Sequence, residues 1–134
     1  MRFPALSMLL IKGRKKEIHE VASLPGIRSL ILRGITEEDY RFFQEMPDLH
    51  GLSIQMGVSK DFSALHDHNN LWILELWQIS HLSDIGFAAK QPQLEWLYLH
   101  LHQHVKAMPY FSQSAHLHII ILNDLKNLVD YAAL

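Results

Sequence analysis

An apolar pattern recurs six times along this chain and leaves few folds open to it. The units begin near residues 5, 27, 49, 71, 94 and 117, so consecutive units are 22 or 23 residues apart. Apolar side chains stand at each start and again three and five residues later, which gives L-x-x-L-x-L or a close variant in every unit. A regular period of this length predicts stacked supersecondary units, each of which buries its apolar edge against the next.

Each unit has two parts. Positions 4 and 6 are apolar and alternate with position 5, which is typical of a strand with one buried face. The second part has apolar residues nine and six positions before the next unit, and a spacing of three places them on one face of a helical turn. These return columns hold Ile18, Val21, Tyr40, Phe43, Phe62, Leu65, Ile85, Ala88, Met108 and Phe111, and also Tyr131 and Leu134 if the last unit has 23 residues.

The boundaries of the return segments carry their own signals. Thr36 before Glu37-Glu38-Asp39 indicates a capped helix start, and Ser59 gives a weaker signal of the same kind. Pro25, Pro47 and Pro92 each stand two residues before a unit start, where a proline ends a helix and favours an extended exit. Strand, turn, helical return and next strand together predict neighbouring strands that run parallel.

This pattern, with its Leu-Pro-x-Ile or Met-Pro-x-Leu lead-in, resembles the leucine-rich-repeat family over essentially the whole chain. The resemblance implies an α/β solenoid, a horseshoe with a parallel concave sheet and a helical or irregular convex side, in a single domain spanning residues 1–134. It departs from the family at position 9, where Asn or Cys is usual. That column reads Gly13, Ile35, Gly57, Ile79, His102 and Leu125, so we expect the usual ladder of hydrogen-bonded side chains to be mostly missing.

Strand positions 3, 5 and 7, flanked by 2 and 8, should face solvent on the concave side. In the last three units these positions gather large apolar and aromatic residues on adjacent strands. The predicted partner-binding residues are Trp72, Ile73, Glu75, Trp77, Trp96, Tyr98, His100, Ile119 and Ile121. Exposed apolar patches usually mark interfaces, and Trp and Tyr often dominate binding energy. Cross-strand packing within the sheet, or burial against a second copy, would explain the same residues.

Seven of the ten histidines form three clusters, namely His66-x-His68, His100-x-His102-x-His104 and His116-x-His118. Imidazole binds zinc, nickel and copper, but no recognised metal-binding spacing is present. We interpret them as loop and strand-end residues, with His118 placed next to Glu95 of the neighbouring strand. A metal site and an interface that responds to pH are the alternatives.

The remaining composition argues against several classes of function. The net charge is −2 and no basic run reaches five residues, so neither nucleic acid nor a membrane surface is the expected partner. The chain has no cysteine, and residues 5–11 are too short an apolar run to span a bilayer, so a cytoplasmic location is the default expectation. No phosphate loop, nucleophile elbow or catalytic triad is found, which predicts neither an enzyme nor a cofactor.

The leading functional hypothesis is therefore a non-catalytic module that binds a protein partner on its concave face. A structural or self-associating repeat segment is one alternative, and a small immunity-type binder that neutralises a toxin is another. Neither end shows a polar cap, and Leu9 and Ile11 of the first unit fall at positions expected to face solvent. The chain is then either a fragment of a longer solenoid or self-associates through its exposed ends.

Overall fold

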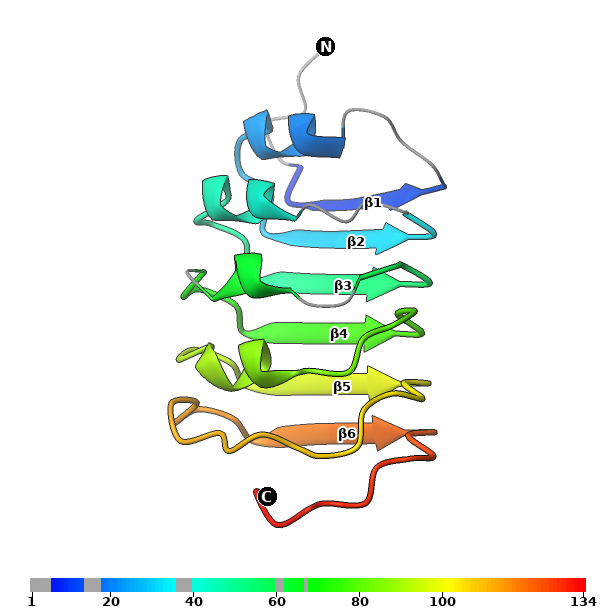
Figure 1. The fold of residues 1–134 in the computed structure, drawn as a ribbon. Coiled ribbons are helices and arrows are strands. Elements are labelled where there is room, and N and C mark those ends of the chain that lie inside the picture. The colour runs from blue at the N-terminus through cyan, green and yellow to red at the C-terminus, as the bar shows by residue number, and fades with distance from the viewer. Residues whose placement is uncertain (1–5, 14–17, 36–39, 60–61, 67) are drawn as a thin grey trace.

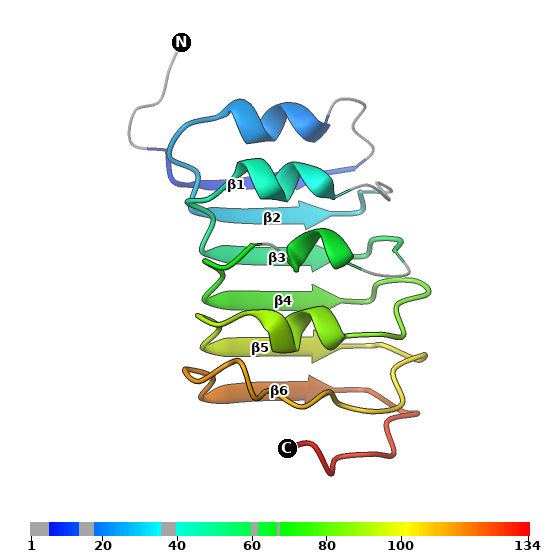
Figure 2. The ribbon, with the colours of Figure 1, turned by 60° about the vertical axis from the view of Figure 1, so that its left-hand side comes forward.

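The computed structural model describes residues 6–13, 18–35, 40–59, 62–66 and 68–134. Its described strands form one parallel sheet in the order β1-β2-β3-β4-β5-β6, so each repeat adds one strand beside the last (Figure 1). The strands are β1 (Met8–Lys12), β2 (Ser29–Arg33), β3 (Gly51–Gln55), β4 (Ile73–Trp77), β5 (Trp96–His100) and β6 (Ile119–Asn123). One face of the sheet is covered by the return segments. We call the other the open sheet face, since no described segment covers it (Figures 1 and 2).

The strand positions predicted from the repeat are correct in five units and wrong in the first. Leu9 and Ile11 pair with Leu30 and Leu32 of β2 and are partly buried in the core, although they were expected to face solvent. The first unit therefore begins at Leu6, one residue later than the sequence pattern indicated. The stretch from residue 8 to 11 is apolar at every position, so alternation could not define its inward face; pairing with β2 does.

The start of each strand has an unusual backbone hydrogen-bond pattern. The carbonyl of Arg28 accepts hydrogen bonds from both His50 and Gly51, at 2.8 and 2.9 Å. Every other pair of neighbouring strands repeats this arrangement, with two successive N–H groups on one carbonyl. Positions 2 and 3 are both exposed at the start of β4 to β6, unlike the alternating positions that follow. We therefore assign position 2 to the open sheet face together with positions 3, 5 and 7.

Each strand also ends in the left-handed backbone region at position 8. The residues there have φ between +51° and +79°, and they are Gly13, Gly34, Met56, Gln78, Leu101 and Asp124. Glycine adopts this conformation freely, whereas other residues have a Cβ close to the carbonyl oxygen. The shared conformation turns all six strands in the same direction, and it supports the corrected alignment of Gly13 with Gly34.

The return segments are short 3₁₀ helices in the first four units. They are η1 (Ile18–Ser23), η2 (Arg41–Glu45), η3 (Ser63–Leu65) and η4 (Gly86–Lys90). The predicted helix start at residues 36–39 lies outside the described residues. Ser59 is not a cap, because η3 begins four residues later with Phe62 before it. Pro25, Pro47 and Pro92 follow the ends of their helices, as expected.

Units five and six return without a helix in the described chain. Met108 is still buried and Phe111 is partly buried, so the fifth return keeps its apolar contacts. Tyr131 and Leu134 are 56% and 59% exposed. These two residues stand in the predicted columns, but no described unit follows to cover them.

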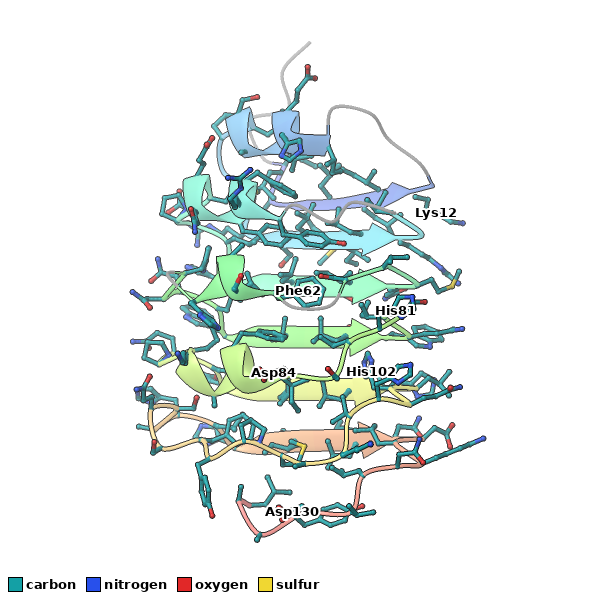
Figure 3. The ribbon with its side chains drawn as sticks, viewed as in Figure 1. Lys12, Phe62, His81, Asp84, His102 and Asp130 are labelled. Atoms are coloured by element: carbon teal, nitrogen blue, oxygen red, sulfur yellow. The ribbon has the colours of Figure 1, made fainter. Side chains whose placement is uncertain are left out.

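The core lies between the sheet and the return segments. Strand positions 4 and 6 supply its leucines and isoleucines, and the return segments supply a row of aromatic rings. The Phe62 ring lies 5.0 Å from that of Tyr40 and 5.4 Å from that of Phe87, so successive units are joined by ring contacts (Figure 3). This core holds the sheet as a firm support for the side chains on its other face.

Candidate functional site

The parallel pairing of β4, β5 and β6 brings the predicted binding residues into rows across the open sheet face. In the position 3 row, Ile73 pairs with Trp96 and Trp96 with Ile119. The position 5 row reads Glu75, Tyr98 and Ile121, and the position 7 row reads Trp77, His100 and Asn123. Neighbouring strands lie about 4.8 Å apart, so side chains within a row contact one another.

Several large apolar residues in these rows, together with Trp72 just before β4, remain exposed to solvent. The exposed fractions are 46% for Trp72, 41% for Ile73, 37% for Trp96, 47% for Ile119 and 40% for Ile121. They are contiguous across three strands, and cross-strand packing leaves more than a third of each uncovered. A continuous apolar surface of this kind is available to a partner.

Trp77 differs from the other two tryptophans because its neighbours already hold it. The His100 ring meets its edge at 5.2 Å, and the Arg33 guanidinium lies 6.0 Å from the centre of the indole. Tyr98 stacks on His100 at 5.9 Å. Trp77 and Tyr98 are only partly exposed as a result. These rings are fixed in place before any partner arrives, while Trp72 and Trp96 offer the larger free surfaces.

Trp72 at position 2 has a neighbour that the sequence analysis did not identify. Its ring stacks on that of His50 with centroids 4.2 Å apart and only 9° between the planes. Both residues occupy position 2 of neighbouring units, so the parallel register places their side chains next to each other.

The open sheet face also extends over β1 and β2, beyond the predicted site. Met8 and Leu10 are 59% and 51% exposed there, and the register error in the first unit hid them. The same end carries the cations Lys12, Arg28 and Arg33. Aligning Gly13 of the first unit with Gly34 of the second, instead of Ala5 with Ile27, gives the register that the structure has.

Two of the clustered histidines lie in loops, as expected, but their side chains are buried in the solenoid. His68 and His102 are 4% and 1% exposed. Nε2 of His68 lies 2.8 Å from the Met46 carbonyl oxygen, and Nε2 of His102 lies 2.8 Å from that of Leu76. Each ring thus contacts a backbone carbonyl group of the preceding unit. His102 stands in the position 9 column, where Ile35 and Ile79 of earlier units are buried, and this apolar column is the sequence signal for its inward side chain.

Burial lowers the pKa of His102 from its ordinary value of 6.5, because the imidazolium would lose its hydration (Figure 3). The nearby His100 acts in the same direction, while the carbonyl groups of Leu76 and Ile79 oppose it. The neutral ring is the favoured form in the fold. Its Nε2–H can then donate to Leu76, as the Asn of a leucine-rich repeat would at this position.

The remaining histidines do not gather into a metal site. No group of three or more His, Cys, Asp or Glu side chains that could hold a metal is found among the described residues. His81 and His104 stack at 6.3 Å beside an open pocket of about 240 Å³, which they line with Gln78 and Gln103. The predicted neighbours His118 and Glu95 are adjacent, since the His118 N–H donates to the Glu95 carbonyl oxygen.

None of the helices in the described part of the chain is long and apolar enough to cross a membrane. No protein-family model and no curated protein matches the sequence. An internalin from Listeria monocytogenes has a similar solved structure, with a TM-score of 0.62 at 18% sequence identity. The match covers 87% of this chain and 38% of the internalin chain. This likeness and the six parallel strands show that the chain has the leucine-rich-repeat solenoid fold.

Proposed function

We propose that this chain is a non-catalytic protein-binding module and that its partner occupies the open sheet face. The observation that carries the proposal is the exposed apolar surface of Trp72, Ile73, Trp96, Ile119 and Ile121, held on three paired strands. Side chains on a paired sheet lose little backbone freedom when they bind. Their contacts therefore contribute to affinity without a large ordering cost.

The polar groups around the apolar surface would set the orientation of the partner. Glu75 is partly exposed between Ser53 and Tyr98 in the position 5 row, and His100 lies at the end of β5. Binding sites commonly combine a central aromatic cluster with a polar rim. Trp96 and Tyr98 would form the centre here, with Glu75 and His100 as the orienting groups.

Affinity capture with the tagged chain tests this proposal directly. We expect proteins retained from the native lysate, including untagged copies of the chain, to be lost when Trp72→Ala and Trp96→Ala are combined. Truncating a central aromatic anchor costs about 2 kcal/mol or more, which is about 30-fold in affinity. Tyr110→Ala is the matched control, because Tyr110 is 74% exposed but lies outside the open sheet face.

Quantitative mass spectrometry of the three samples would give the answer. A protein depleted in the double variant and retained by Tyr110→Ala supports binding through the open sheet face. Identical retention by all three chains would refute it. Circular dichroism of each variant confirms that the comparison is made between folded chains.

A further inference from the structure

The two halves of the open sheet face differ in both charge and size. Its charged residues on β1 and β2, and at their starts, are the cations Lys12, Arg28 and Arg33, whereas those of β4 and β5 are the carboxylates Glu75 and Glu95. The side chains in the position 3 row are small on β2 and β3, with Ser29 and Gly51, and large on β4 to β6, with Ile73, Trp96 and Ile119. The two halves therefore carry opposite charges, and the small residues beside the centre in one half correspond to large ones in the other.

We propose that the partner of this face is a second copy of the chain, packed sheet to sheet about a twofold axis parallel to the strands. The inference rests on the proposed function and names its partner. Rotation about this axis reverses the order of the strands but keeps their direction. Strand β1 of one copy then faces β6 of the other, β2 faces β5, and β3 faces β4, with each position opposite the same position.

Charge supports this arrangement. Arg28 and Glu95 are both exposed, and both occupy position 2 of their units. Because β2 faces β5, Arg28 of each copy meets Glu95 of the other, and the twofold axis makes this contact twice. Opposite charges placed in this way suppress other pairings and steer association.

Size supports it independently. Gly51 on β3 faces Ile73 on β4, and Ser29 on β2 faces Trp96 on β5, so a small side chain receives a large one at the centre. At the two ends, Met8 faces Ile119, and Leu10 faces Ile121 by the same rule. These last four residues are between 40% and 59% exposed in the single chain, and the pairing covers them with apolar surface.

The other twofold axis in the plane of the sheet does not give these contacts. An axis perpendicular to the strands places each strand against its own copy and sets position 3 opposite position 7. Trp96 would then face His100, and neither Arg28 nor Glu95 would find an opposite charge. The distribution of residues thus favours the axis parallel to the strands over the axis perpendicular to them.

The available area indicates how tight such a dimer is. Six strands of five residues make a face of about 29 Å by about 17 Å, or roughly 1,000 Å² counted over both copies. Figures 1 and 2 show little splay between the first and last strands, so two faces can pack along their length at the usual spacing of about 10 Å. This area is at the lower end for specific interfaces, and the dimer should depend on concentration.

Sedimentation equilibrium on purified chain tests the pairing, over about 10 µM to about 1 mM, where an interface of this size should dissociate. We expect the wild type to dimerise. Arg28→Glu and Glu95→Arg should each weaken the dimer at least about tenfold, because each alone sets like charges opposite. An equimolar mixture of the two variants should dimerise again, since the new carboxylate then faces the new guanidinium. Lys90→Glu, on η4 of the covered side, is the control and should behave as the wild type.

A mixture that dimerises shows that both variants are folded, and circular dichroism of each variant establishes the same where the mixture does not dimerise. A wild type that stays monomeric throughout the range overturns the inference, and so does a mixture that fails to dimerise. A dimer that Arg28→Glu leaves unchanged also overturns the inference, and it would indicate association through the edge strands β1 or β6 instead. If the wild type is monomeric while the tryptophan-dependent capture yields a different protein, the proposed function stands and only the second copy is excluded.

Discussion

Acidification should destabilise this solenoid through His102. The ring is almost completely buried, and its Nε2 is 2.8 Å from the Leu76 carbonyl oxygen of the preceding unit. Nδ1 has no hydrogen-bond partner among the described residues. Burial lowers the pKa of His102 below 6.5, so the folded chain resists the proton that the unfolded chain accepts. His102→Gln isolates this effect, because a glutamine amide can donate to the same carbonyl without titrating in this range.

The sign and the slope follow from proton linkage. Well above pH 6.5 the ring is neutral in both states, and it adds no pH dependence. Between 6.5 and the lower pKa of the folded state, the unfolded chain binds one more proton at this side chain. The free energy of unfolding then falls by up to about 1.4 kcal/mol for each pH unit of acidification, and the loss ends below the folded-state pKa.

Urea unfolding at pH 7.5, 6.5, 6.0 and 5.5, followed by circular dichroism, would measure this contribution. We expect the wild type to lose stability relative to His102→Gln as the pH falls through 6.5, while their difference levels off toward pH 7.5. His104→Gln, at an exposed position on the same loop, controls for the removal of an imidazole. If the difference between the wild type and His102→Gln stays the same across the whole range, the buried ring does not act as reasoned.

Two further predictions concern the packing of the repeat. Phe62 is buried, and Phe62→Ala should lower the free energy of unfolding by about 3–5 kcal/mol. Phe62→Leu should lower it by only about 1–3 kcal/mol, because leucine fills most of the volume but loses the ring contacts with Tyr40 and Phe87. Equal losses in urea unfolding would contradict a separate role for the rings. Gln78 is exposed with φ +51°, so Gln78→Gly should stay within about 1 kcal/mol of the wild type, while Gln78→Val should cost about 1–2 kcal/mol. Thermal unfolding that ranks valine with glycine would argue against strain at position 8.

The open sheet face could be predicted in part because a side chain in a parallel stack meets the same position of the neighbouring units. The alignment of Leu74, Leu97 and Ile120 in the sequence is enough to place Trp96 beside Ile73 and Ile119, and the structure has this pairing. The same rule places Trp72 beside His50, since both occupy position 2, although the sequence analysis did not name this pair. Only the tertiary structure shows that the two rings are stacked, with 9° between their planes.

The sequence by itself determined the period, the apolar columns and the parallel order, because burial of a repeated edge requires the same residue type at every turn of the solenoid. Only the tertiary structure decided the alignment of the first strand, where Met8 to Ile11 are apolar on both faces and pairing with β2 selects the inward side. It also decided the burial of His68 and His102, whose polar rings are tolerated only because backbone carbonyl groups of earlier units lie within 2.8 Å. The repeat pattern can be read from each unit alone. The hydrogen bonds of His68 and His102 join residues more than twenty positions apart, so they exist only once the units have stacked.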